Sequence, residues 1–279
     1  MSIKIEAETK VDSVPYVLAW DEKLFVGTES GHIYSYSADL SSNTSWPAHS
    51  VQLFALAAGE GNIYSSSNDG CIRVWNSDGE KIKEFPLNGG DVGVLRVFGK
   101  QVFAGDEIGN IVVYENDVEK AKYNVLEEVK DLWFDAPYLF TVRDLDVTVT
   151  EIKPDESKTR FITRRTMEGR APLRVVGSKL LVVARGGNSL RLHDSSFDTG
   201  FKLLHEIKVS DMIVTSIAVT GDYVWTAGWD GFVRRWKIVS DKLEAAGEVN
   251  LGACVNSLSS NLNNVYAAIA DGKIVLMNA

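Results

Sequence analysis

Residues that could carry out catalysis are few in this sequence, and they do not form a known catalytic pattern. The four histidines lie far apart along the chain, at His32, His49, His193 and His205. There is no Gly-x4-Gly-Lys-Ser/Thr phosphate loop, no Gly-x-Ser-x-Gly nucleophile elbow and no His-Glu-x-x-His zinc motif. The glycine-rich residues 89–93 precede an expected strand, so they lack the helix N-terminus that commonly binds phosphate. The sequence therefore predicts a protein that is not an enzyme, with no catalytic residue, cofactor or metal.

The two cysteines bear on the cellular compartment. Cys71 and Cys254 each lie in or beside an expected strand, and two cysteines are too few for a disulfide framework. We interpret both as buried apolar thiols, a common role of free cysteine. No apolar run approaches the ~20 residues of a membrane-spanning helix. Residues 1–6 also lack the apolar stretch of a signal peptide. These features predict a cytoplasmic or nuclear protein.

The net charge of −9 argues against generic attraction to nucleic acid or to an anionic membrane. The charge is spread unevenly, because residues 151–193 hold ten Lys or Arg against four Asp or Glu. Such a basic sector is either a binding site or a solvated face, and both interpretations stay open. The expected partner is a protein or a peptide, with no nucleic acid and no membrane.

A repeated pattern of thirteen residues organises the chain. In residues 63–75, two β-prone runs flank Asn68, Asp69 and Gly70, residues that favour a tight hairpin turn. Six further windows match this one without gaps, and the seven windows end at Tyr36, Trp75, Tyr114, Glu151, His193, Trp236 and Met277. Their spacing of about 40 residues is typical of the four-stranded blade of a β-propeller. The sequence therefore predicts an all-β, seven-bladed β-propeller that forms a single domain over residues 1–279.

The two ends of the chain are expected to complete one blade together. Residues 3–8 read as a strand with no hairpin of their own, whereas the seventh repeat stops after its third strand. Pairing between these strands would close the ring and protect sheet edges. In the fifth repeat, Ala171 and Arg174 replace the apolar pair that marks most innermost strands. This strand is therefore expected to be shifted or bulged.

The second repeat contains four residues of a hydrogen-bonded set: His49, Ser67, Asp69 and Trp75. On these residues and on its period, the whole chain resembles the WD-repeat β-propeller family. The resemblance implies that the imidazole links the buried hydroxyl and indole to the carboxylate, since buried donors need partners. The sixth repeat keeps Asp230 and Trp236 but has Gly228 in the serine position and no histidine. Repeats four and five, which end in Glu151 and His193, depart furthest from the family pattern.

In this family, the face formed by the hairpin turns and by the loops leading into the inner strands is the usual docking surface. The resemblance implies the same face here, and Trp and Arg are enriched at interface hot spots. The candidate partner-binding residues on this face are Glu29, Asp91, Glu107, Glu128, Asp144, Arg143, Arg170, Arg185, Ile213 and Trp229. Two alternatives are that Trp229 packs against a neighbouring loop and that the acidic residues only keep the protein soluble.

These observations predict a non-enzymatic scaffold or adaptor that binds a protein or peptide partner as a subunit of a larger complex. A partner with a basic segment beside an apolar anchor would suit the acidic residues and Trp229. One alternative is a phosphorylated or acidic ligand held by Arg143, Arg170 and Arg185, because arginine matches phosphate geometry. Another is a propeller enzyme with a site in the central channel. Such a site would show converging histidines or carboxylates, or a bound metal, at the channel mouth.

Overall fold

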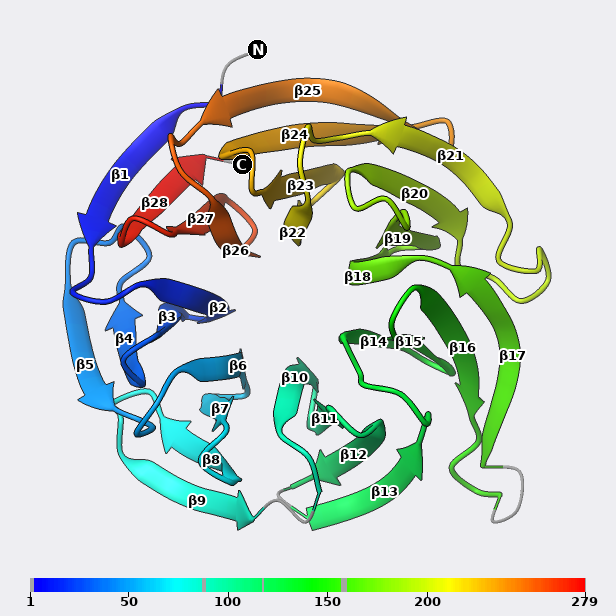
Figure 1. Cartoon of the computed structure of the whole chain (residues 1–279), viewed down its shortest axis with the longest axis horizontal. Coiled ribbons are helices and arrows are strands. Elements are labelled where there is room, and N and C mark those ends of the chain that lie inside the picture. The colour runs from blue at the N-terminus through cyan, green and yellow to red at the C-terminus, as the bar shows by residue number, and fades with distance from the viewer. Residues whose placement is uncertain (1–2, 87–88, 117, 157–159, 279) are drawn as a thin grey trace.

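The computed structural model describes residues 3–86, 89–116, 118–156 and 160–278, and it shows seven four-stranded antiparallel sheets arranged in a ring (Figure 1). The expected seven-bladed propeller is therefore confirmed. Within the described residues, no helix has the length and apolar character needed to cross a bilayer.

The blades follow one another along the chain, and in blades one to six the strands lie in sequence order from the axis outward. Blade one comprises β2 (Pro15–Asp21), β3 (Lys23–Thr28), β4 (His32–Tyr36) and β5 (Asn43–Pro47). Blade two comprises β6 (Leu53–Gly59), β7 (Asn62–Ser67), β8 (Cys71–Asn76) and β9 (Lys81–Pro86). Blade three comprises β10 (Val92–Phe98), β11 (Gln101–Asp106), β12 (Asn110–Glu115) and β13 (Val118–Asn124). Blade four comprises β14 (Asp131–Asp135), β15 (Tyr138–Val142), β16 (Asp146–Ile152) and β17 (Phe161–Glu168). Blade five comprises β18 (Arg170–Val176), β19 (Lys179–Val183), β20 (Ser189–Asp194) and β21 (Leu203–Lys208). Blade six comprises β22 (Val214–Thr220), β23 (Tyr223–Gly228), β24 (Phe232–Val239) and β25 (Lys242–Asn250). Blade seven comprises β26 (Val255–Ser260), β27 (Asn264–Ile269), β28 (Lys273–Asn278) and β1 (Ile5–Lys10).

The N-terminal strand closes the ring, as the sequence predicted. β1 pairs antiparallel with β28, with Ala7 opposite Leu276 and Lys10 opposite Lys273 (Figure 1). The strand begins two residues later than the expected range of 3–8. Ile3, which precedes it, is buried in the apolar layer between blades six and seven. The first strand of the chain thus belongs to the last sheet.

Each sheet packs between two neighbours, which explains the composition of its middle strands. Residues 24–28 of β3 and 265–269 of β27 are buried without interruption. A sheet covered on both faces favours such continuous apolar runs over strict alternation. The outer strand β13 is mostly exposed and carries charged residues. The core therefore lies in layers between adjacent sheets.

The hairpin of blade four is one residue shorter than the gap-free repeat predicted. In blade two, Ile63 pairs with Trp75 across β7 and β8. In blade four, the equivalent Leu139 pairs with Thr150, so the assignment of Glu151 to the tryptophan position was wrong. A shift of one residue reverses which sheet face a side chain occupies. Thr150 therefore faces the layer that the indole occupies in blade two.

The hairpin of blade five is longer than the predicted one, whereas that of blade four is shorter. His193 does occupy the tryptophan position, but it pairs with Leu180, so this hairpin is one residue longer than the predicted window. The inner strand β18 is bulged between Arg170 and Leu173, as predicted, but the inner strands of blades one, two, three, six and seven are also bulged near their starts, so the lack of the apolar pair does not explain the bulge. The two most divergent repeats are thus the two in which the register departs from the common pattern.

We expect removal of residues 1–10 to destabilise the protein, because it takes buried Ile3 and a whole strand from blade seven. The loss of this strand also leaves β28 as an unpaired edge. The expected decrease in the free energy of unfolding is at least about 3 kcal/mol, or about 5 °C or more in Tm. A synthetic peptide of residues 1–11 added in trans should restore part of the loss. A truncated protein that melts like the full chain would contradict the closure.

Candidate functional site

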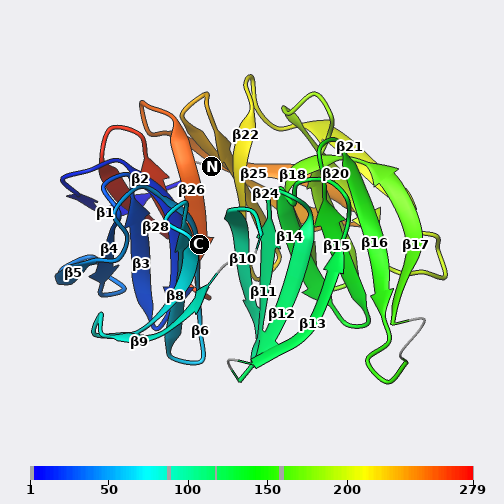
Figure 2. The ribbon, with the colours of Figure 1, turned by 60° about the horizontal axis from the view of Figure 1, so that its bottom comes forward.

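Two sets of loops lie together on one face of the ring. Because strands alternate in direction, the turns between second and third strands share one end of the sheets with the loops that join successive blades (Figure 2). Backbone hydrogen bonds connect the two sets, since Glu107 N donates to Asp91 O at 3.0 Å and Trp229 N to Ile213 O at 3.0 Å. We call this end the turn face, and the candidate partner-binding residues all lie on it.

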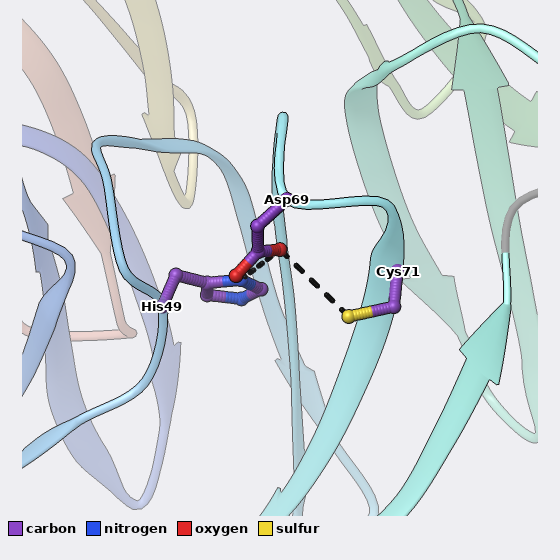
Figure 3. A group of neighbouring side chains, drawn as sticks. All are labelled: His49, Asp69 and Cys71. Carbon is purple, nitrogen blue, oxygen red and sulfur yellow. Dashed lines mark hydrogen bonds and ion pairs between the residues drawn. The ribbon is translucent and has the colours of Figure 1, made fainter.

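A chain of buried hydrogen bonds stabilises the turn face at blade two. Trp75 Nε1 donates to Ser65 Oγ at 2.9 Å, and Ser65 Oγ lies 2.8 Å from His49 Nε2. His49 Nδ1 lies 2.9 Å from Asp69 Oδ1 (Figure 3). Because the Asp69 carboxylate only accepts, His49 Nδ1 carries the ring proton, and burial, which lowers the pKa of His49, leaves Nε2 to accept from the Ser65 hydroxyl. His49 is therefore a neutral imidazole that links the strands to the turn.

The hydroxyl in this set belongs to Ser65, so the sequence-based assignment to Ser67 was wrong. Ser67 Oγ donates instead to the backbone carbonyl oxygen of Gln52 at 2.7 Å. The strand register gives the reason. Trp75 lies opposite Ile63, and Ser65 is the next residue on the same sheet face, within diagonal reach of the indole. Ser67 lies one step further away.

Arg73 completes the set electrostatically. Its Nη1 donates to Asp69 Oδ2 at 2.7 Å and to the carbonyl oxygen of Ala48 at 2.7 Å. Burial alone would raise the pKa of the Asp69 carboxyl, but hydrogen bonds from His49 and Arg73 outweigh it and hold that pKa low. Burial lowers the pKa of His49 despite the neighbouring carboxylate. The result is an ion pair beside a neutral imidazole.

The same region contains a group of potential metal ligands, but its chemistry favours the hydrogen-bonded set. His49, Asp69 and Cys71 each offer a ligand atom, and these atoms lie within 4.8 Å of one another (Figure 3). Burial raises the pKa of the Cys71 thiol to about 11, whereas a metal binds the thiolate. The Arg73 guanidinium is already hydrogen-bonded to the Asp69 carboxylate, and its positive charge disfavours a metal cation there. Both cysteines are free thiols, and Cys254 is half-buried.

Blade six contains a variant of this set that the sequence analysis missed in part. Trp236 Nε1 donates to Thr226 Oγ1 at 2.9 Å, so the hydroxyl comes from Thr226, and Gly228 was the wrong position to inspect. Ser210 takes the place of the histidine and donates to Asp230 Oδ2 at 2.9 Å. Each hydroxyl lies two residues before the position used in the sequence alignment, which explains both errors.

The central channel opens on the turn face in a recess of about 380 Å³. Trp229, Ile213 and Arg170 from the candidate residues line it, together with Tyr16 and Phe54, which sequence reasoning missed. The side chain of Trp229 is 52% exposed and that of Phe54 is 36% exposed. A tryptophan that keeps half its surface in water is not fully packed against a neighbouring loop. The recess therefore combines an aromatic rim with a basic wall.

Inside the channel, one buried carboxylate joins three blades. Asp131 Oδ1 accepts from Arg96 Nη2 at 2.6 Å, and Oδ2 accepts from Arg174 Nη1 at 3.1 Å. Burial alone would raise the pKa of Asp131, but the two guanidinium charges outweigh it and hold that pKa low. Burial, with the charge of Arg96, lowers the pKa of Arg174 to about 10. Two guanidiniums against one carboxylate leave the channel positively charged.

The acidic candidates form a separate arc on the same face. Glu29, Glu107, Glu128 and Asp144 are exposed, whereas Asp91 is half-buried. Burial, together with the nearby charges of Glu107 and Asp69, raises the pKa of Asp91. The carboxylates around Asp91 therefore repel one another, and a cation placed there would relieve this repulsion.

The structure does not gather the three candidate arginines into one site. Arg143 lies 3.7 Å from Glu127 and Arg185 lies 3.8 Å from Asp146, both measured between charged atoms. Arg170 lines the channel recess and has no ion pair among the described residues. Arg143 instead lines a different pocket, between blades three and four.

Comparison with known proteins identifies the fold and no more. The sequence matches no known protein family, and no curated protein is a detectable relative. Three similar solved structures are a chain of a mitotic checkpoint complex (14% identity, TM-score 0.84, covering 100% of this chain and 92% of that chain), the WD40 β-propeller domain of Doa1 (14%, 0.81, 99% and 96%) and the WD40 repeats of RRP9 (14%, 0.83, 99% and 99%). At this identity a shared fold does not transfer a function.

We expect Ser65→Ala to cost about 2 kcal/mol of unfolding free energy, because it leaves the Trp75 and His49 nitrogens unsatisfied in the interior. Ser67→Ala removes one hydrogen bond to a backbone carbonyl and should cost about 1 kcal/mol. Urea unfolding of the two variants measures this difference. A larger loss for Ser67→Ala would contradict the assignment of the hydroxyl.

Stability should fall as pH decreases below 6.5, because burial lowers the pKa of both His49 and His193 from that ordinary value. In this range the unfolded chain binds protons that the folded protein does not, so acid favours unfolding. Each histidine contributes at most about 1.4 kcal/mol per pH unit. Unfolding free energies at a series of pH values should show a smaller slope in His49→Gln and in His193→Gln. An unchanged slope in both variants would refute this origin.

Proposed function

Because the chain has the fold of WD40-repeat propellers, we propose that it is a non-enzymatic scaffold that binds a protein or peptide partner on its turn face. The observation that carries this proposal is the half-exposed Trp229 at the rim of the channel recess. Exposing the large apolar surface of a tryptophan to water is unfavourable, and tryptophan is among the residue types most enriched at binding hot spots. Phe54, which comes from blade two on another side of the channel, adds a second aromatic side chain to the lining of the same recess.

The large exposed apolar side chains of the described chain are divided equally between the two faces, so their number does not select a face. On the turn face they are Val51, Phe54, Ile108, Leu126, Met212 and Trp229, and toward the opposite face they are Ile82, Val118, Phe197, Leu203, Val239 and Leu262. The turn face is favoured because Phe54 and Trp229 line one recess there, and recesses with aromatic lining are common binding sites. A similar solved fold belongs to a chain of a mitotic checkpoint complex, which fits a role as a subunit of an assembly.

The charges around the recess indicate the chemistry of the partner. An apolar side chain would occupy the aromatic rim at Trp229 and Phe54. Basic residues beside that anchor would face Glu29 and also Asp91 and Glu107, whose carboxylates repel one another. Charge complementarity of this kind mainly increases the association rate and selects among partners. The proposed partner is therefore a segment with an apolar anchor flanked by basic residues.

A channel enzyme receives less support from the same geometry. Among the described residues that line the two channel recesses, Asp131 is the one carboxylate and there is no histidine. Both oxygens of Asp131 are already bonded to arginine side chains and backbone amides. No pair of groups is positioned there for proton transfer.

Affinity capture from native lysate tests the docking face when wild-type protein is compared with matched variants. Proteins that depend on the proposed site should be depleted by Trp229→Ala and by Asp91→Lys. They should be retained by Leu262→Ala, which removes an 88% exposed side chain from the opposite face. For a partner purified in this way, Trp229→Ala should weaken binding about 30-fold, the effect of a hot spot worth about 2 kcal/mol. If Trp229→Ala binds the partner as tightly as wild type does and Leu262→Ala binds it more weakly, the docking site lies on the opposite face.

A further inference from the structure

Blade four has lost the hydrogen-bonded set that fills the interior of blade two. The register places Leu139 opposite Thr150 and Thr141 opposite Thr148, where blade two pairs Ile63 with Trp75 and Ser65 with Arg73. Thr150 therefore replaces the tryptophan, and Thr148 replaces the arginine. Both threonines are buried, at 4% and 7% exposure. Blade four therefore has the short side chains of Thr148 and Thr150 where blade two has the long side chains of Arg73 and Trp75.

The histidine of the set is also missing from blade four. In blade two, His49 N donates to the carbonyl oxygen of Gly31 in the preceding blade, as does the residue before it. In blade four, Val125 N donates to the equivalent carbonyl of Gly109, so the next residue, Leu126, occupies the histidine position. Leu126 is 86% exposed, so its side chain does not fill the interior.

A pocket of about 370 Å³ lies where these side chains are absent. Thr148 and Thr150 form its buried end, and Thr163 and Thr166 of β17 line its exposed side. Such a volume is at the lower end of the range found for small-ligand sites, about 300–1,000 Å³. The pocket therefore has room for a small ligand or for one side chain of a partner.

One wall of the pocket is aromatic and another is cationic. The rings of Tyr123 and Phe161 stack with centroids 4.4 Å apart and line the pocket together. Arg143 reaches it from the turn between β15 and β16, and its side chain is only 20% exposed. Its nearest carboxylate, Glu127, is 54% exposed and lies 3.7 Å away, which makes a weak surface ion pair. None of the described lining residues is acidic.

Three buried polar atoms of residues that line the pocket have no hydrogen-bond partner among the described residues. They are Thr148 Oγ1, Arg143 Nε and the hydroxyl oxygen of Tyr123. Leaving a buried donor unsatisfied is costly, and native proteins rarely do so without a ligand or water to accept the bond. All three groups can donate, and together with the remaining hydroxyls they suit a ligand with several acceptor oxygens and negative charge.

We propose that this pocket binds a phosphate monoester. Arg143 pairs with the phosphate oxygens, Thr148 and Thr150 donate hydroxyl hydrogen bonds to them, and the Tyr123–Phe161 stack packs against the carbon chain that carries the phosphate. A phosphate has enough acceptor oxygens for all of these donors, whereas a carboxylate has fewer. The inference does not depend on the docking site at Trp229, because the two sites share no lining residue.

Binding to the full-length protein can be measured by fluorescence polarisation and by calorimetry. The probes are a labelled phosphothreonine peptide library with degenerate flanks, its unphosphorylated counterpart, free O-phospho-L-threonine and inorganic phosphate. The phosphorylated library and wild-type protein should form a complex that the unphosphorylated library does not form. Binding of the library alone identifies a phosphorylated protein as the source of the phosphate, whereas equal binding of free phosphothreonine identifies a small metabolite.

Variants connect the binding to the pocket. Arg143→Gln should weaken the binding at least tenfold, and Thr148→Val should weaken it severalfold without lowering Tm, because that hydroxyl has no protein partner to lose. Thr150→Trp should fill the pocket and abolish the binding. Arg165→Gln, which removes an exposed arginine from the same blade, is the matched control and should bind as wild type does. The proposal is overturned if no phosphorylated probe binds, or if Arg143→Gln and Arg165→Gln weaken the binding equally.

Discussion

The antiparallel pairing of β1 with β28 places both ends of the chain in one sheet, and the rest of the propeller depends on it. Each sheet buries apolar residues on both of its faces, so each needs two neighbouring sheets. An open row of seven sheets would leave the two terminal sheets with an uncovered face. Closure gives every sheet its second neighbour, and the buried Ile3 adds an apolar anchor to the joint. Closure therefore protects the cores of blades one and seven, the two sheets that an open row would leave uncovered.

The polar set of blade two shows how a layer between sheets can be filled by hydrogen-bonded groups. Trp75, Ser65, His49 and Asp69 satisfy one another in a single donor direction, from the indole to the carboxylate. Blade six achieves a similar arrangement with a serine hydroxyl in place of the imidazole. In blade four the large members are replaced by threonines, and a pocket remains. The departure from the repeat is thus also where the fold gains a polar cavity.

Charge is separated between the inside and the outside of the channel. In the interior, Arg96 and Arg174 share Asp131, and this contact links the inner strands of blades three, four and five. Outside the recess, the turn face carries the acidic residues Glu29, Asp91, Glu107, Glu128 and Asp144, and the chain as a whole carries a charge of −9. A buried carboxylate with two cations and two backbone donors is well satisfied, so it holds the three strands in one arrangement. The aromatic rim at Trp229 lies between these two regions of opposite charge.

The sequence by itself determined the number of blades and the closing strand. A period of about 40 residues repeated through the chain predicts a β-propeller, an architecture in which every repeat can bury its hairpin. Sequence could not choose between Ser65 and Ser67, because both face the same side of β7 and only the reach of the indole separates them. It also could not reveal that the hairpin of blade four lacks a residue, which moves Thr150 inward and creates the pocket. Arg96, Asp131 and Arg174 lie about one repeat apart along the chain, and only the closed ring, in which successive inner strands surround one axis, brings their side chains into contact.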